Sequence, residues 1–113
     1  MGRNSLGALE EAVMLVVLAL GENAYGVAIR DELSKRTRRD HSFGAVYTTL
    51  DRLADKEFVI SWLGSPSPER GGRAKRFFKL TDSGQKMLDE TLKAHRDLAQ
   101  GLAAGQILAA GAH

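Results

Sequence analysis

Residues 42–63 have the sequence SFGAVYTTLDRLADKEFVISWL, and the spacing of the apolar residues changes part-way along it. In the first part, apolar side chains recur at steps of three and four residues, at Phe43, Val46, Tyr47, Leu50 and Leu53. This spacing predicts one buried face of a helix from Phe43 to about Lys56, for which Ser42 is a suitable N-cap. After it the period changes to two: Phe58, Ile60 and Trp62 alternate with Val59, Ser61 and Leu63, which is typical of a β-strand.

Two helices are predicted before this stretch. Apolar residues at helical spacing favour a first helix that begins after Asn4 or Ser5 and ends at Gly21, and a second from about Tyr25 to Thr37. The polar, basic stretch that follows, residues 36–40, predicts a turn.

A second strand and a last helix are predicted after it. Residues 64–72 hold both prolines and three glycines, which indicates a loop, and alternation returns from Arg73 to Leu80. Thr81 is a suitable cap for the last helix. Its apolar seam consists of Leu88, Leu92, His95, Leu98 or Ala99, and Leu102.

The predicted order of elements defines a fold class. Three helices, a two-stranded β wing and a C-terminal helix form a mainly α, winged helix-turn-helix protein. We expect a winged-helix domain over residues 5–81, a dimerisation helix over 82–104 and a flexible tail over 105–113. The seam of the last helix is too long for the small core alone, and the first helix is apolar on two faces, which favours a second chain as partner.

Charge is segregated along the chain. Residues 35–80 hold eleven basic and five acidic side chains, a net charge of +6, whereas both flanking segments are net negative. A polyanion would be attracted to this middle segment, although a solvated surface with chance clustering would give the same balance.

The third predicted helix has the features of a DNA recognition helix. Such helices enter the major groove with their N-terminal residues facing the base edges. Small and hydroxyl-bearing residues there permit close approach and hydrogen bonding, and a basic residue follows one turn later: Ser42, Gly44, Ala45, Thr48, Thr49 and Arg52. The alternative is an ordinary capped surface helix.

The predicted wing loop is basic and rich in glycine. Arg70, Arg73 and Lys75 lie in or beside the Arg70-Gly71-Gly72-Arg73 segment, and a narrow minor groove attracts arginine. A hairpin that is basic only for solubility would have the same composition.

Several other classes of function find no support. The chain lacks cysteine, and His41, His95 and His113 show no metal-ligand spacing, so we expect no catalytic residues, no metal, no cofactor and no enzymatic activity. The longest apolar run, Ala12 to Leu20, is too short for a membrane span of about 20 residues. With no signal region, a cytoplasmic protein is expected.

Five motifs together resemble the PadR family of bacterial transcriptional regulators. They are LGALE (residues 6–10), AYGVAI (24–29), SFGAVYTTL (42–50) with Arg52-Leu53, ERGGR (69–73) and FFKLTDSG (77–84), and the similarity covers roughly residues 5–95.

The resemblance implies a homodimer that binds a palindromic operator in double-stranded DNA and represses transcription. Ser42, Gly44, Ala45, Tyr47 and Thr48 would lie in or beside the major groove, and Arg70, Arg73 and Lys75 would serve the wing. The first and last helices would form the dimer, through Leu6, Leu9, Val13, Leu88, Leu92, His95, Leu98 and Leu102.

Two points stay open at this stage. Some relatives bind a small aromatic effector near the dimer centre, with a tryptophan on the last helix, whereas the single tryptophan here, Trp62, lies on the first wing strand and is expected in the core. The alternative to DNA binding is a winged-helix module for protein–protein contact, which would not need the clustered positive charge.

Overall fold

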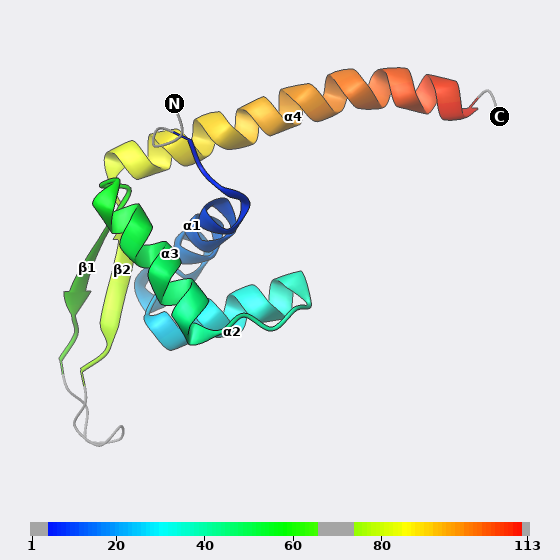
Figure 1. The fold of residues 1–113 in the computed structure, drawn as a ribbon. Coiled ribbons are helices and arrows are strands. Elements are labelled where there is room, and N and C mark those ends of the chain that lie inside the picture. The colour runs from blue at the N-terminus through cyan, green and yellow to red at the C-terminus, as the bar shows by residue number, and fades with distance from the viewer. Residues whose placement is uncertain (1–4, 66–73, 112–113) are drawn as a thin grey trace.

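A computed structural model describes residues 5–65 and 74–111 and confirms the predicted order of elements (Figure 1). Three helices come first, α1 (Ala8–Leu20), α2 (Gly26–Thr37) and α3 (Phe43–Asp55), with a 3₁₀ turn, η2 (Gly21–Asn23), after α1. The strands β1 (Val59–Leu63) and β2 (Arg76–Leu80) follow, and α4 (Asp82–Gly111) ends the fold. The chain is therefore a winged helix-turn-helix with one long C-terminal helix.

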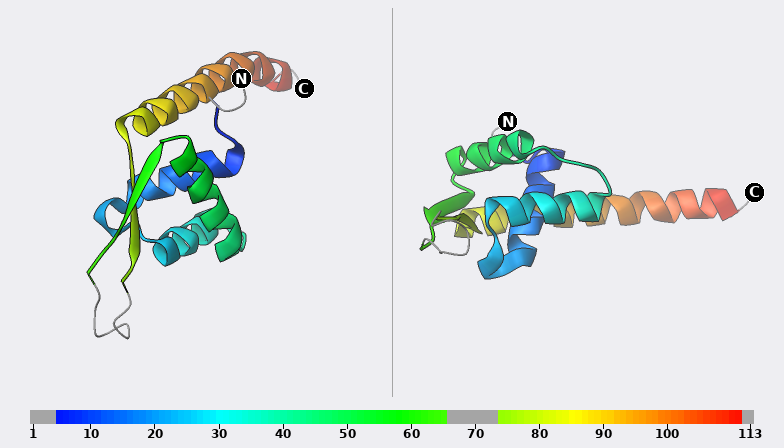
Figure 2. Two further views of the ribbon diagram at one scale, coloured as in Figure 1. Left: turned by 60° about the vertical axis from the view of Figure 1, so that its left-hand side comes forward. Right: turned by 90° about the horizontal axis from the view of Figure 1, so that it is seen from below.

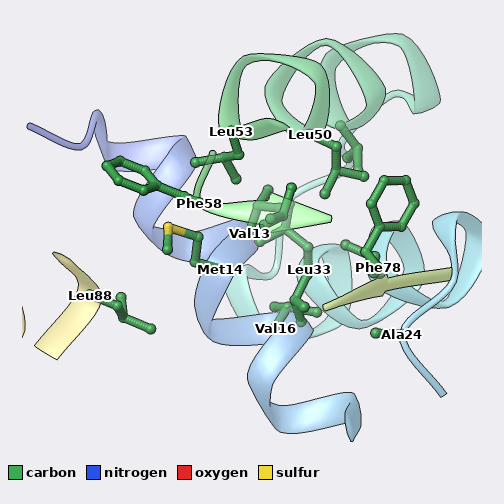
Figure 3. Close-up of a cluster of buried hydrophobic side chains, with 14 residues drawn as sticks. Val13, Met14, Val16, Ala24, Leu33, Leu50, Leu53, Phe58, Phe78 and Leu88 are labelled. Atoms are coloured by element: carbon green, nitrogen blue, oxygen red, sulfur yellow. The ribbon is translucent and has the colours of Figure 1, made fainter. Parts of the chain in front are cut away.

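The core lies where the three short helices meet the hairpin (Figure 3). α1 supplies most of one wall with Val13, Met14, Val16 and Val17, and the other elements close the remaining sides. Those are Ala24, Ile29 and Leu33 near and in α2, Val46, Leu50 and Leu53 in α3, Phe58, Val59 and Phe78 of the hairpin, and Leu88 of α4. The apolar stripes predicted on α1, α2 and α3 are thus largely buried, except at the start of α3, whereas the seam predicted on α4 is buried only at Leu88 and half-buried at Leu92.

The two strands form an antiparallel hairpin whose register runs from Val59 opposite Leu80 to Leu63 opposite Arg76. Residues that face each other across such a pair share a sheet face, so Val59 and Phe78 point into the core, while Trp62 and Phe77 lie on the other face. The expectation of a core tryptophan is wrong, because Trp62 keeps 45% of its surface exposed.

The first turn of α4 is fixed against the start of the sheet. The Thr81 hydroxyl accepts from the Gly84 N–H at 2.9 Å and donates to the Glu57 carbonyl at 2.7 Å, as expected of a cap. A Cβ at residue 84 would lie 2.0 Å from the Phe58 carbonyl oxygen, so only glycine permits this approach. Leu88, fully buried, then anchors the helix with about 1.5–3 kcal/mol of apolar burial.

The rest of α4 leaves the body of the protein. It extends to Gly111, so the helix does not end near residue 104 as expected, and its 30 residues span about 45 Å. Every described side chain from Lys93 to Leu102 is exposed. Figures 1 and 2 show this helix projecting past the three-helix body.

Two of the predicted dimer contacts are wrong. Val13 and Leu88 have no exposed surface and belong to the core of one protomer, because each lies on the helix face turned towards the hairpin and the other helices. Leu6, Leu9 and Leu92 are half-buried against the same core, whereas His95, Leu98 and Leu102 are exposed. The first helix also starts later than expected, at Ala8, because the Gly7 N–H donates to the Glu10 carboxylate at 2.7 Å and Gly7 becomes the N-cap.

Candidate nucleic-acid interface

The N-terminal half of α3 presents a narrow exposed stripe. Gly44, Ala45, Thr48 and Arg52 are all exposed and follow one another at steps that keep them on one side of the helix. The Ser42 hydroxyl accepts from the Ala45 N–H at 3.1 Å and so fixes the first turn, as predicted. A Cβ at residue 44 would meet only the Ser42 Oγ, at 3.9 Å, so the helix start is open to close approach.

Thr49 does not belong to this stripe, contrary to expectation. It is 3% exposed, and its hydroxyl donates to the Ala45 carbonyl at 2.8 Å. One residue advances a helix by about 100°, which turns Thr49 from the side of Thr48 towards the core side of Val46 and Leu50. Its hydroxyl is satisfied within the helix and is not available to a base.

Phe43, which was predicted in the buried stripe, is on the surface. It is 41% exposed at the first position of α3, stacked at 6.5 Å on Tyr47. The Arg30 guanidinium lies 4.7 Å from its ring centroid, while the Arg30 Nε donates to the His41 carbonyl at 2.9 Å. Arg30 therefore joins α2, the turn and the tip of α3, a role for which the sequence offered no signal.

Tyr47 supports the recognition helix from behind. Its half-buried ring packs onto α2 so closely that a Cβ at residue 26 would lie 1.7 Å from the phenol oxygen. The motif Tyr25-Gly26 at the start of α2 thus has a steric reason, since Gly26 makes the space that Tyr47 occupies.

The turn between α2 and α3 carries unpaired positive charge. Arg38 adopts a left-handed conformation (φ 56°) that ends α2, and the Ser34 hydroxyl accepts from the His41 N–H at 3.0 Å. Arg36 is paired with Glu32, but in the described part of the chain Arg38 and Arg39 form no ion pair. The turn keeps these cations free for a polyanion.

At the root of the wing, Lys75 lies over the Tyr25 ring, with 3.7 Å between the ring centroid and the ammonium nitrogen. Arg70 and Arg73 lie outside the described residues. The N-terminal end of α3 and the ends of β1 and β2 that lead into the loop point to the same side of the protein, away from α4 (Figures 1 and 2). The structure therefore brings the start of α3 and the wing root to one side of the protein.

The opposite end of α3 is fixed by a half-buried ion pair. The Lys56 Nζ donates to both Glu10 oxygens, at 2.9 and 2.8 Å, and to the Ser5 carbonyl at 3.1 Å. Burial alone would raise the pKa of Glu10, but the Gly7 N–H, Lys56 and Arg52 together hold that pKa below 4.5. The Glu10 carboxylate of α1 is thus paired with Lys56, the residue that follows α3.

Residues 14–90 match the transcriptional regulator PadR-like family. The chain belongs to this family. The match covers more than half of the 113 residues and spans α2, α3 and the wing, so it confirms the resemblance inferred from the motifs.

Solved structures of PadR-like proteins share the fold. A PadR-like transcription factor from Bacteroides fragilis is 22% identical, with a TM-score of 0.69 over 85% of this chain and 87% of that one. A PadR-like regulator from Bacillus cereus is 21% identical, with a TM-score of 0.71 over 87% and 90%. Bacillus subtilis PadR in complex with operator DNA is 22% identical, with a TM-score of 0.65 over 76% of this chain and 47% of that one. No match was found among curated protein sequences.

The described residues offer neither a metal site nor a membrane span. In residues 5–65 and 74–111, no group of three or more His, Asp or Glu side chains is placed to hold a metal ion. None of the described helices combines the length and apolarity that crossing a bilayer requires.

Proposed function

We propose that this PadR-family protein is a sequence-specific, double-stranded DNA-binding regulator that acts as a homodimeric repressor on a palindromic operator in the cytoplasm. The observation that carries the proposal is the surface shared by the exposed start of α3 and the wing root, together with the unpaired cations of the turn that leads into α3. α3 enters the major groove, and Gly44 and Ala45 allow its backbone close to the base edges.

The roles within this surface follow from side-chain chemistry. Thr48 offers a hydroxyl to a base and a methyl group to thymine, and the exposed ring of Phe43 offers a second apolar contact to a thymine methyl. Ser42 and the free N–H groups of the first turn bind a phosphate, as do Arg38, Arg39, Arg52 and Lys75. Arg70 and Arg73 carry positive charge towards the minor groove.

Dimerisation is assigned to the part of α4 beyond Leu92. Leu98 and Leu102 are exposed on a helix that has already left its own core, so a second copy is the natural cover for them. Further exposed apolar surface lies along the α1–α2 groove, at Leu15 and Ala19. A two-fold pair would place the two α3 helices about one helical turn apart on DNA, or a multiple of it. Repression follows if the operator overlaps the site that RNA polymerase needs.

A small aromatic effector at the dimer centre, which the resemblance suggests, would meet no aromatic side chain from α4, since residues 82–111 contain none. The accessible indole of this chain lies at the wing instead.

Selection of bound fragments from random duplexes tests the proposal directly. A palindromic consensus, with binding that weakens by about 0.9 log unit per phosphate contact for each decade of salt, is the expected result. If the protein captured all duplexes equally, or captured none, the alternative of a winged-helix module for protein–protein contact would be the correct interpretation.

A further inference from the structure

A groove of about 640 Å³ lies beside the wing, on the sheet face that carries Trp62 and Phe77. The C-terminal end of α1 supplies one wall, including Leu18, and η2 supplies Glu22. Lys79 on β2 lines the same groove. All of these residues belong to one protomer, so the groove is complete without a second chain.

The floor of the groove is flat, aromatic and held in place. The Trp62 and Phe77 rings stack with an interplanar angle of 17° and a centroid distance of 6.0 Å. Phe77 meets the edge of Tyr25 at 5.7 Å, and a Cβ at residue 64 would lie 2.5 Å from the Phe77 ring, so neighbours hold this ring on two further sides. A preordered ring surface loses little conformational entropy when it binds a ligand.

The rim carries one free charge of each sign. Glu22 and Lys79 are both exposed, and in the described part of the chain neither side chain forms a hydrogen bond or an ion pair. An ion of either sign would gain attraction from one of them and repulsion from the other. The rim therefore favours an occupant without net charge that offers polar atoms at its edges.

We propose that this groove binds an aromatic molecule of two or three rings with no net charge, one ring of which stacks on Trp62. The volume lies within the range of small-molecule sites, about 300–1,000 Å³, and such sites combine apolar walls with a few polar groups. The groove offers an aromatic ligand a stacking contact on the exposed indole of Trp62. The Leu18 side chain on its aliphatic wall would add an apolar contact. The inference does not depend on DNA binding, and its test involves no DNA.

The probe for the test is N-phenyl-1-naphthylamine, an uncharged dye in which an amine nitrogen joins a phenyl ring to a naphthalene ring system. Because Trp62 is the single tryptophan of the chain, loss of its emission by energy transfer reports that the dye is bound, and the variants below show whether it occupies the groove. We expect saturable loss of tryptophan emission with one dye per chain. The sulfonated analogue with the same rings, 8-anilinonaphthalene-1-sulfonate, is expected to bind no more tightly than the uncharged dye.

A matched pair of variants decides whether the dye occupies the groove. Leu18→Glu places a charge on its wall and should weaken binding at least about tenfold. Val27→Glu introduces the same charge at an equally exposed apolar residue on α2, outside the groove, and should leave binding unchanged (exposed fractions 48% and 46%). If the sulfonated dye bound more tightly than the uncharged dye, the inference that the ligand carries no net charge would be wrong.

Two other results would overturn the proposal as a whole. Equal binding by wild-type protein and Leu18→Glu would mean that the dye binds elsewhere. Dye affinity that falls with rising protein concentration would mean that a second copy of the chain covers the groove. The sedimentation coefficient of Leu18→Glu does not decide this, because Leu18 also lines the neighbouring groove between α1 and α2.

Discussion

The ion pair between Glu10 and Lys56 makes a quantitative prediction about stability. Replacing Lys56 with methionine leaves the Glu10 carboxylate with one remaining donor, the Gly7 N–H, in a site where that side chain is 10% exposed. Breaking a fully buried pair costs about 3–5 kcal/mol, and an exposed pair is worth at most about 1 kcal/mol. Because Lys56 itself is 21% exposed, we expect an intermediate loss of about 1–3 kcal/mol at neutral pH.

The pKa shift of Glu10 determines in which direction this stability contribution changes with pH. The pKa of Glu10 is lowered in the folded protein from 4.5, so its contribution to stability is fully present above 4.5. It is lost as the pH falls through the folded pKa, since the protonated carboxyl no longer attracts Lys56. The difference in free energy of unfolding between wild type and Lys56→Met should therefore be large at pH 7 and small at pH 3.

Urea unfolding at the two pH values, at one protein concentration, measures the effect. A double-mutant cycle with Glu10→Gln separates the pair from the individual side chains, and its coupling energy of about 1–2 kcal/mol should be smaller at pH 3 than at pH 7. Arg36→Met, which removes the exposed pair with Glu32, is the matched control and should change stability much less than Lys56→Met does. An undiminished coupling energy at pH 3 would refute the reasoning.

Four further variants have distinct expected outcomes. Thr48→Ala should reduce discrimination between operator and altered sites by about 1–3 kcal/mol, measured by competition binding, whereas an equal loss on all duplexes would exclude a base contact. Lys75→Ala should weaken binding on every duplex and lower the slope of log affinity against log salt by about one unit; an unchanged slope would remove Lys75 from the interface. Leu98→Asp combined with Leu102→Asp should give monomers in sedimentation, and a persistent dimer would place the interface elsewhere. Gly84→Ala should cost about 1–3 kcal/mol in thermal or urea unfolding because of its contact with the Phe58 carbonyl, and wild-type stability would show that the first turn of α4 can shift.

The exposed face of α3 was predicted correctly where local chemistry alone decides the outcome. Ser42 caps α3 because a hydroxyl at that position accepts from an N–H three residues later, whatever the rest of the fold. Gly44, Ala45, Thr48 and Arg52 are exposed because the helical period places them opposite Val46 and Leu50. Those residues were correctly expected on one surface.

Errors arose where side-chain burial depends on elements far apart in the sequence. Thr49 and Thr48 are indistinguishable by type, and only the position of the core relative to α3 decides which one is buried. Phe43 has the period of a core residue but lies at the tip of α3, beyond the edge of the core, where Arg30 covers part of its ring. Trp62 has the alternation of a strand, which does not say which face of a two-stranded sheet will be covered.

The amino-acid sequence by itself determined the order and type of the elements, the caps at Ser42 and Thr81, and the charge of the segment between residues 35 and 80. These properties follow from period, from hydrogen bonds within one turn and from composition, all of which act over a few residues. Only the tertiary structure decided that Val13 and Leu88 are internal, that Trp62 forms the floor of a groove, and that the start of α3 and the wing root share a surface. The physical reason is that exposure is a property of packed elements, and no single element contains the information about which neighbour will cover it.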